Sequence, residues 1–395
     1  MKRYISIILA FVMLITSLCG CSLFNDNAKN GVLSIPRKGQ EYYKRVIYNN
    51  TGNGDIITQY TNNYLTIFES DINLVFDQNA KLVYDGSEGK LSSAKIYGDK
   101  IICEKNLINL KNGNKEEFFS GYEPLDYSNG YWSVKNDNNK CGIIDDKGNE
   151  IIPCKYDIIS TFDEKGYALV GDYTEQKFGM IDKDNNLVIP INYTYLVPFN
   201  AKINGYYGDL YIKTETTYDY TLASNSDESV FTIDREGNTI FEISDSEYKP
   251  VLGTWTLTQN MIPVEKDGLC GYIDMQGNEV IPPKYNKVVW DFVNGYSCVS
   301  VGSNYGIINV KGEEILPFEY SSITPFDQNG LAIARTNNSG ETQIIDLAGN
   351  VAYSTNNSIE AIGGGYFKED YNQIIQITTD KSDYETYTPK GFILD

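Results

Sequence analysis

The chain contains no histidine among its 395 residues. Without an imidazole it has no Ser-His-Asp or Cys-His catalytic apparatus, no histidine general base and no His-ligated zinc, copper or iron site. It also has no glycine-rich phosphate loop, since the run 363–365 lies in a β context and is predicted to be a turn. We therefore predict a protein that is not an enzyme, with no catalytic residue, no cofactor and no metal site.

Basic residues are scarce, because 33 Lys and Arg stand against 53 Asp and Glu and give a net charge of -20. Proteins that bind nucleic acid need clustered Lys and Arg to neutralise phosphates, and polybasic membrane patches need the same clusters. The charge balance therefore excludes nucleic acid as a partner. It is compatible with cationic ligands but selects none of them.

Cysteines are few and lack the paired spacing of a zinc site, because the sequence contains no C-x-x-C. Five lie beyond residue 100: Cys103, Cys141, Cys154, Cys270 and Cys298. Cys141 and Cys154 flank a predicted hairpin and could form a disulfide across it. We favour the alternative that they are small buried apolar residues.

The apolar run at residues 4–18 follows the charged start Met1-Lys2-Arg3 and is shorter than the about 20 residues that span a bilayer. These features are typical of a secretory signal peptide, here residues 1–20. The run ends in Leu18-Cys19-Gly20-Cys21, which resembles the lipobox of bacterial lipoproteins, although Cys19 departs from the usual Ala, Ser or Thr. The alternatives are a cleaved signal with an incidental cysteine and an uncleaved anchor.

The lipobox resemblance implies cleavage before Cys21 and a thioether-linked diacylglycerol on that residue, which supplies the acyl chains that stable attachment requires. The chain is then expected on the extracytoplasmic face of the cell membrane. The polar residues that follow predict a tether over 21–40 and a folded domain over 41–395.

Beyond the tether the sequence repeats itself. Four segments share a Gly-x-Ile-Asp/Asn start, a turn, and an Ile/Leu-Pro end: 142–153, 179–190, 271–282 and 306–317. Weaker copies lie at 231–240 and 343–351, and only the outline remains at 74–84 and 107–118. The β-branched pairs predict strands, and the Asp and Gly between them predict a tight hairpin with a bulge. With no sustained helical periodicity, we predict an all-β fold of repeated four-stranded units.

The spacing of these segments resembles the bacterial WG (or KWG) repeat. The Trp-Gly of that family is represented by Cys141-Gly142, Phe178-Gly179, Cys270-Gly271 and Tyr305-Gly306. The resemblance implies a β-propeller-like array in a surface or envelope protein, and it brings no catalytic residues. Eight hairpins can be counted, centred near 79, 112, 147, 184, 236, 276, 311 and 348, so we expect seven or eight blades.

Residues that recur in every unit are predicted to serve the fold. The repeated acids Asp145, Asp182, Asp234, Asp274 and Asp346 are interpreted as turn residues, with a calcium loop at 182–186 as the weaker alternative. The repeated aromatics Tyr156, Tyr193, Tyr285, Tyr320, Phe162, Phe199, Phe292 and Phe326 are interpreted as core between blades, with a sugar-binding ring of tyrosines as the alternative.

The stretch 200–228 interrupts the repeat and is predicted as an insertion or an elongated hairpin between blades. Its tyrosines make it the candidate recognition loop: Tyr206, Tyr207, Tyr211, Tyr218 and Tyr220. The alternative is a surface hairpin whose tyrosines and threonines reflect only strand propensity.

Three hypotheses about function follow. The first is a surface-anchored lipoprotein that binds or scaffolds an envelope protein or a cell-wall polymer. The second is a carboxylate-based glycan hydrolase or lyase that uses the propeller funnel, which needs two acids about 5 to 10 Å apart. The third is a chaperone-like assembly factor with an apolar groove.

Overall fold

The computed structural model describes residues 33–49, 57–61, 63–69, 72–86, 94–103, 106–197, 199, 205–207, 210–212, 219–225, 229–243, 246–251, 260–337, 340–371 and 373–381. Strands, turns and irregular connections make up all of these segments. None of the described residues belongs to a helix that is long and apolar enough to cross a membrane. Cys21 and the predicted signal peptide lie outside the described residues.

The fold is all-β and is built from repeated antiparallel units of four strands, as predicted. Unit 1 comprises β2 (Ile57–Thr61), β3 (Tyr64–Glu69), β4 (Ile72–Asp77) and β5 (Leu82–Asp85). Unit 2 comprises β6 (Ala94–Tyr97), β7 (Lys100–Cys103), β8 (Asn106–Asn109) and β9 (Lys115–Glu117). Unit 3 comprises β10 (Tyr122–Ser128), β11 (Tyr131–Asn136), β12 (Cys141–Asp145) and β13 (Glu150–Tyr156).

The middle of the chain forms units 4 to 6. Unit 4 comprises β14 (Ile158–Ile159), β15 (Ala168–Asp172), β16 (Lys177–Ile181) and β17 (Leu187–Tyr193). Unit 5 comprises β18 (Tyr195–Leu196), β21 (Tyr220–Ser224), β22 (Val230–Asp234) and β23 (Thr239–Glu242), with the separate hairpin β19 (Gly205–Tyr207) and β20 (Leu210–Ile212) inserted after β18. Unit 6 comprises β24 (Lys249–Pro250), β25 (Met261–Lys266), β26 (Leu269–Asp274) and β27 (Glu279–Tyr285).

Units 7 and 8 share one long strand. Unit 7 comprises β28 (Lys287–Val293), β29 (Tyr296–Val301), β30 (Asn304–Asn309) and the first part of β31 (Glu314–Ile323). The end of β31 then pairs with β32 (Leu331–Thr336), which is followed by β33 (Thr342–Asp346) and β34 (Val351–Thr355). Unit 9 comprises β35 (Ile359–Gly363), β36 (Tyr366–Glu369), β37 (Gln373–Thr378) and β1 (Tyr43–Asn49).

The described residues thus form nine units, since seven four-stranded sheets accompany one seven-stranded sheet that contains two units sharing β31. The prediction of seven or eight blades was wrong. The count of hairpins with an Asp-Gly or Asn-Gly type of turn missed unit 9, which has no such hairpin between its third and fourth strands. Its fourth strand is β1, which pairs antiparallel with β37 from Tyr43–Thr378 to Asn49–Gln373.

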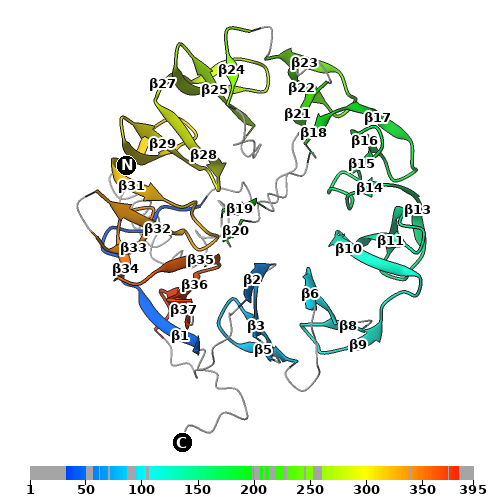
Figure 1. The fold of residues 1–395 in the computed structure, drawn as a ribbon, viewed down its shortest axis with the longest axis horizontal. Coiled ribbons are helices and arrows are strands. Elements are labelled where there is room, and N and C mark those ends of the chain that lie inside the picture. Colours follow the sequence, from blue (N-terminus) through cyan, green and yellow to red (C-terminus); the bar gives the residue numbers. More distant parts are fainter. Residues whose placement is uncertain are drawn as a thin grey trace, which may run out of the picture.

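The units follow one another around a ring, with the first strand of each unit toward the centre (Figure 1). Neighbouring strands are antiparallel, so the loop between the first and second strands of a unit, its inner loop, lies on the same face as the hairpin between its third and fourth strands. We call this the hairpin face; its hairpins are Asp77–Lys81, Asn109–Asn114, Asp145–Asn149, Asp182–Asn186, Asp234–Asn238, Asp274–Asn278, Asn309–Glu313 and Asp346–Asn350. The opposite, crossover face carries the turns between second and third strands and the connections between units.

The core lies between units, because each sheet buries its two faces against its neighbours. In β12 both Ile143 and Ile144 are fully buried, whereas in the outermost strand β13 only Ile152 is. One apolar cluster joins Cys141 of unit 3 to Phe162 and Val170 of unit 4. The repeated phenylalanines are all buried, and the repeated tyrosines are buried or packed against these clusters, which confirms their prediction as core between blades: Phe162, Phe199, Phe292, Phe326, Tyr156, Tyr193, Tyr285 and Tyr320.

A buried carboxylate holds β1 in the closing unit. Glu369 of β36 is 3% exposed and accepts hydrogen bonds from Lys44 Nζ of β1 at 2.5 Å and from the Tyr353 hydroxyl of β34 at 2.7 Å. Asn357 Nδ2 donates to the same carboxylate at 3.1 Å. Burial alone would raise the pKa of Glu369, but the hydrogen bonds from Lys44 and Tyr353 outweigh it and hold that pKa below its usual range. The N- and C-terminal strands are therefore joined by charge as well as by a backbone ladder.

We expect Glu369→Gln to lower the free energy of unfolding by about 2 kcal/mol, because it leaves Lys44 facing an amide in a desolvated site. The matched control is Glu360→Gln on the adjacent strand, whose pair with Lys368 is 3.7 Å long and only partly buried, so that it is worth less than about 1 kcal/mol. Guanidinium unfolding followed by tryptophan fluorescence measures both variants. Equal losses would show that Glu369 does not hold the closure.

Candidate functional site

The repeated acids on the hairpin face cap their own turns. In unit 3, Asp145 Oδ1 accepts hydrogen bonds from the backbone N–H of Lys147 and Asn149 at 2.8 Å, and Oδ2 accepts from Asn149 Nδ2 at 2.8 Å. The same three bonds recur at Asp182, Asp234, Asp274 and Asp346. The prediction that these acids are turn residues is confirmed. The structure does not favour the weaker calcium alternative at 182–186. Both carboxylate oxygens of Asp182 already accept hydrogen bonds from Asp184 and Asn186 within the turn.

Glycine recurs three residues before the turn in the four strong copies, at Gly142, Gly179, Gly271 and Gly306, because the backbone of the next strand leaves no room for a side chain. A Cβ built on Gly142 would lie 2.5 Å from the carbonyl oxygen of Ile152, and one on Gly271 would lie 2.4 Å from that of Ile281. Within the turn, the backbone needs a positive φ, which Asn185 supplies at 63° where the other strong copies have glycine. The repeated Gly positions are therefore structural.

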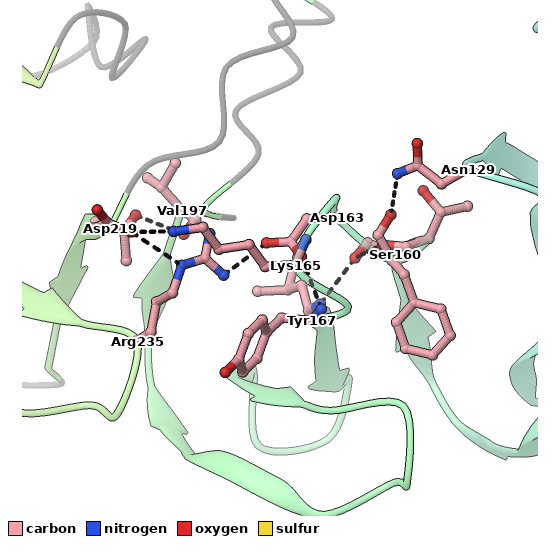
Figure 2. A network of polar contacts seen from close by, with 12 residues as sticks. Asn129, Ser160, Asp163, Lys165, Tyr167, Val197, Asp219 and Arg235 are labelled. Atoms are coloured by element: carbon pink, nitrogen blue, oxygen red, sulfur yellow. Dashed lines mark hydrogen bonds and ion pairs between the residues drawn. The ribbon is translucent and has the colours of Figure 1, made fainter.

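The residue after the capping acid reaches into the preceding unit. Leu347 joins the buried cluster of unit 7, and Met275 joins that of unit 5. Arg235 occupies the same position in unit 5, and its guanidinium contacts Asp163 on the inner loop of unit 4 at 2.9 Å (Figure 2). The hairpins thus act as wedges between blades, and the wedge of unit 5 is both charged and buried.

Arg235 lies in a nearly closed polar and aromatic site. Its side chain is 8% exposed and that of Asp163 is 1% exposed. The guanidinium carbon lies 4.5 Å from the centre of the Phe199 ring and 5.0 Å from that of Tyr167. On the solvent-exposed side of this site, Asp219 lies 4.0 Å from Arg235 Nε and also pairs with Lys165 (Figure 2). This network fixes the point at which the insertion returns to the ring, because Asp219 immediately precedes β21.

A second buried acid occupies the corresponding inner loop of unit 8. Asp327 is 2% exposed and accepts hydrogen bonds from the backbone N–H of Asn329 at 2.9 Å, Leu331 at 3.0 Å and Gly365 at 2.6 Å. Burial raises the pKa of Asp327 to about 6, and those bonds only partly offset the rise. Its charge also contributes to the raised pKa of Tyr60, after burial of that phenol. Both acids accept two backbone N–H bonds within their own loops, and they differ at Oδ2, where Asp327 has the N–H of Gly365 and Asp163 has the guanidinium of Arg235.

The inserted hairpin reaches across the ring. β19 and β20 pair with each other from Gly205–Ile212 to Tyr207–Leu210, and β20 lies against β35 of unit 9 and β2 of unit 1. This hairpin follows β18 of unit 5 in the chain, yet β19 and β20 lie near the middle of the ring, beside units 9 and 1 (Figure 1). As the inner loop of unit 5, it belongs to the hairpin face.

The residues of the candidate recognition loop do not all belong to one hairpin. Tyr206 of β19 faces Tyr211 of β20 in the register of the hairpin, and Tyr207 pairs with Leu210. Tyr218 lies outside the described residues. Tyr220 belongs instead to β21, where it pairs with Asp234 and packs against the core of unit 5.

The thiols offer no reactive centre in the described part of the chain. Cys141, Cys154, Cys270 and Cys298 are free, and Cys141 faces Tyr156 rather than Cys154 across its hairpin. Burial raises the pKa of Cys154 to about 11 and that of Cys298 to about 12. The interpretation of Cys141 and Cys154 as unbridged residues is confirmed, although Cys154 is only partly buried.

Sequence reasoning missed the two buried inner-loop acids, Asp163 and Asp327. A signal was present, because Phe162-Asp163 and Phe326-Asp327 are each followed by Gly three residues after the acid, at Gly166 and Gly330. That shared spacing predicts a capped turn, but it does not reveal that one acid faces Arg235 and the other faces Gly365. Those partners come from neighbouring units.

Comparison with known proteins agrees with this architecture. Four segments match the family described as WG containing repeat: residues 142–171, 178–208, 271–305 and 305–339. The chain therefore carries WG-containing repeats, as the spacing of its Gly-x-Ile-Asp segments predicted. A search of curated proteins gave no match.

Solved structures with a related arrangement share little sequence with this chain. The crystal structure of the eukaryotic initiation factor has 10% identity over 76% of this chain and 87% of its own, with a TM-score of 0.47. BamB from Moraxella catarrhalis has 10% identity over 87% of this chain and 100% of its own, with a TM-score of 0.37. Hsv2p from Kluyveromyces lactis has 9% identity over 65% of this chain and 93% of its own, with a TM-score of 0.36. The ring is therefore established by the strand pairings and the arrangement in Figure 1, and not by these similarities.

We expect Arg235→Met to lower the free energy of unfolding by about 3 kcal/mol, because it leaves Asp163 buried without its cation. Lys183→Met is the matched control, since Lys183 holds the same turn position in unit 4 but is exposed over the Tyr131 ring, and it should cost less than about 1 kcal/mol. Adding Asp163→Asn to Arg235→Met should restore part of the loss in chemical unfolding. No recovery in the double variant would contradict the charge argument.

We expect stability to fall as the pH rises from about 4.5 to 6.5, because the pKa of Asp327 is about 6 in the folded chain and about 3.9 when unfolded. Stability from a raised pKa is fully present below the unfolded value and is lost through the folded one. Among the carboxyls with lowered pKa values, Asp145 and Asp182 act at lower pH and Glu369 adds stability only at the lower end of this range, and no histidine titrates in this window. Unfolding midpoints of the wild type and Asp327→Asn across these pH values test this, and parallel curves would contradict it.

Proposed function

We propose that this protein is a non-catalytic binding module that a lipid on Cys21 holds at the extracytoplasmic face of the cell membrane, where it binds an envelope protein or a wall polymer. The observation that carries the proposal is that polar side chains of the ring hold its turns and its neighbouring units together. The repeated acids cap turns, and Asp163 and Glu369 are engaged by Arg235 and Lys44. A rigid closed ring with an added hairpin at its centre suits binding rather than turnover.

Three features of the described residues support a binding role. No cluster of three or more His, Cys, Asp or Glu side chains in the described part of the chain could hold a metal ion. Asp327, the acid whose pKa is raised by burial, is held by three backbone N–H groups and is 2% exposed, so it is poorly placed to protonate a polymer. The hairpin β19–β20 lies at the ring centre, where a propeller commonly receives its ligand.

The anchor is tested by expressing the full chain with and without Cys21→Ser. We expect the wild-type chain in the membrane fraction, with its N-terminal peptide heavier by the mass of a diacylglycerol, and the variant released in soluble form. Equal membrane association of the two chains would contradict the lipid anchor. A control substitution at Cys19, Cys19→Ser, keeps Cys21 and should leave the membrane fraction unchanged.

The binding role is tested with the wild-type chain from the membrane fraction and with purified wall glycan. We expect glycan or an envelope protein to be retained by the wild-type chain with its length unchanged. Release of shortened glycan fragments would overturn the non-catalytic proposal and direct attention to paired carboxylates of the funnel. A chain carrying Asp327→Asn is a further test of binding against cleavage. It should retain as much glycan or envelope protein as the wild-type chain does.

A further inference from the structure

The chain enters the ring across one face. Leu33 N–H donates to the carbonyl oxygen of Asn294 at 2.9 Å, and the Tyr296 hydroxyl donates to the carbonyl oxygen of Leu33 at 2.8 Å. Asn294 lies on the inner loop of unit 7, between β28 and β29, so the first described residues lie on the hairpin face near the inner rim. Leu33 also packs against the buried cluster that contains Trp290.

From Leu33 the chain runs outward over the hairpin of unit 8 before it becomes β1. We call residues 33–42 the strap; most of it falls in the stretch predicted as tether. Asn350 Nδ2 donates to the carbonyl oxygen of Arg37 at 2.9 Å, and Gly39 N–H donates to Asn350 Oδ1 at 2.7 Å. The Tyr42 hydroxyl donates to Asp346 Oδ2 at 2.9 Å, and Lys38 Nζ donates to the carbonyl oxygen of Ala348 at 3.1 Å. These contacts fix the strap on the hairpin face.

The length of chain between the strap and Cys21 is short. Cys21 and Leu33 are twelve residues apart, and twelve residues span at most about 40 Å even when fully extended. A lipid on Cys21 therefore pulls on the ring at Leu33, which lies close to the inner rim of the hairpin face. A pull applied near the centre of one face orients the ring with that face toward the bilayer, whereas a pull at the outer edge would hold it on its side.

We propose that the hairpin face is the membrane-facing surface of this protein and that the crossover face points outward. The proposal rests on the lipid anchor at Cys21 proposed above and adds the orientation of the ring. The surface that faces the lipid carries the strap, the capped hairpins and the inserted hairpin β19–β20. A wall polymer then meets the crossover face, and β19–β20 is reached from the membrane side.

Matched positions at the two ends of one unit can report the orientation. Lys311 lies in the hairpin between β30 and β31, and Ser303 lies in the turn between β29 and β30; both are exposed. Lys147 and Asn138 are the equivalent exposed pair in unit 3. The experiment introduces Lys311→Cys, Ser303→Cys, Lys147→Cys and Asn138→Cys singly into the full chain, labels each with a donor fluorophore, and measures energy transfer to a headgroup-labelled lipid in phosphatidylcholine vesicles that carry the acylated protein. Labelling of the parent chain gives the background from its own cysteines.

The expected result is transfer that is about twofold or more higher from positions 311 and 147 than from 303 and 138, because the six residues of β30 separate the two ends by about 20 Å. Equal transfer from both ends, or higher transfer from 303 and 138, would overturn the orientation while leaving the anchor intact. If the wild-type chain is not acylated and gives no more vesicle binding than Cys21→Ser, the proposed anchor itself fails, and the orientation fails with it. The mass of the N-terminal peptide distinguishes these outcomes.

Discussion

Packing between neighbouring sheets is the constraint on which the rest of this structure depends. A single four-stranded unit has two apolar faces and cannot bury either alone, so its second and third strands are apolar on both sides and need a neighbour on each. The pair Ile143 and Ile144 shows the consequence, because adjacent residues that point to opposite faces are both fully buried. A ring satisfies every unit only if it closes. Closure falls to unit 9, where β1 pairs with β37 and Lys44 meets Glu369.

The capped hairpin supplies the second recurring interaction, because it ties each blade to the one before it. The acid cap fixes the turn, and the following side chain then fits into the preceding unit as Leu347, Met275 or Arg235. One turn geometry thus accepts an apolar or a charged wedge, provided that the neighbouring inner loop offers a matching partner. In unit 4 that partner is Asp163, which explains why a charged residue can occupy a position that is apolar in units 6 and 8.

The two faces of the ring differ because the chain enters, inserts and turns on one of them. The strap, the hairpins and the long inner loop of unit 5 all lie on the hairpin face, whereas the crossover face carries the turns between second and third strands and the connections between units. Some crossovers are a single residue, and in β31 the fourth strand of unit 7 becomes the first strand of unit 8 without interruption. Short crossovers keep adjacent blades in fixed register.

The sequence by itself determined the repeat, the strands, the capped turns and the buried aromatics, because these features depend on residues close together in the chain. The turn from Asp145 to Asn149 is one example, and the contact between Gly142 and the strand that follows it is another. Each is explained by residues within one short segment. Only the tertiary structure decided the number of units, because β1 joins β37 across more than 300 residues of chain. It likewise decided that Asp163 faces Arg235, that burial raises the pKa of Asp327, and that β20 lies against β35 and β2. Each of these depends on which units the closed ring brings together, and local propensity contains no information about that.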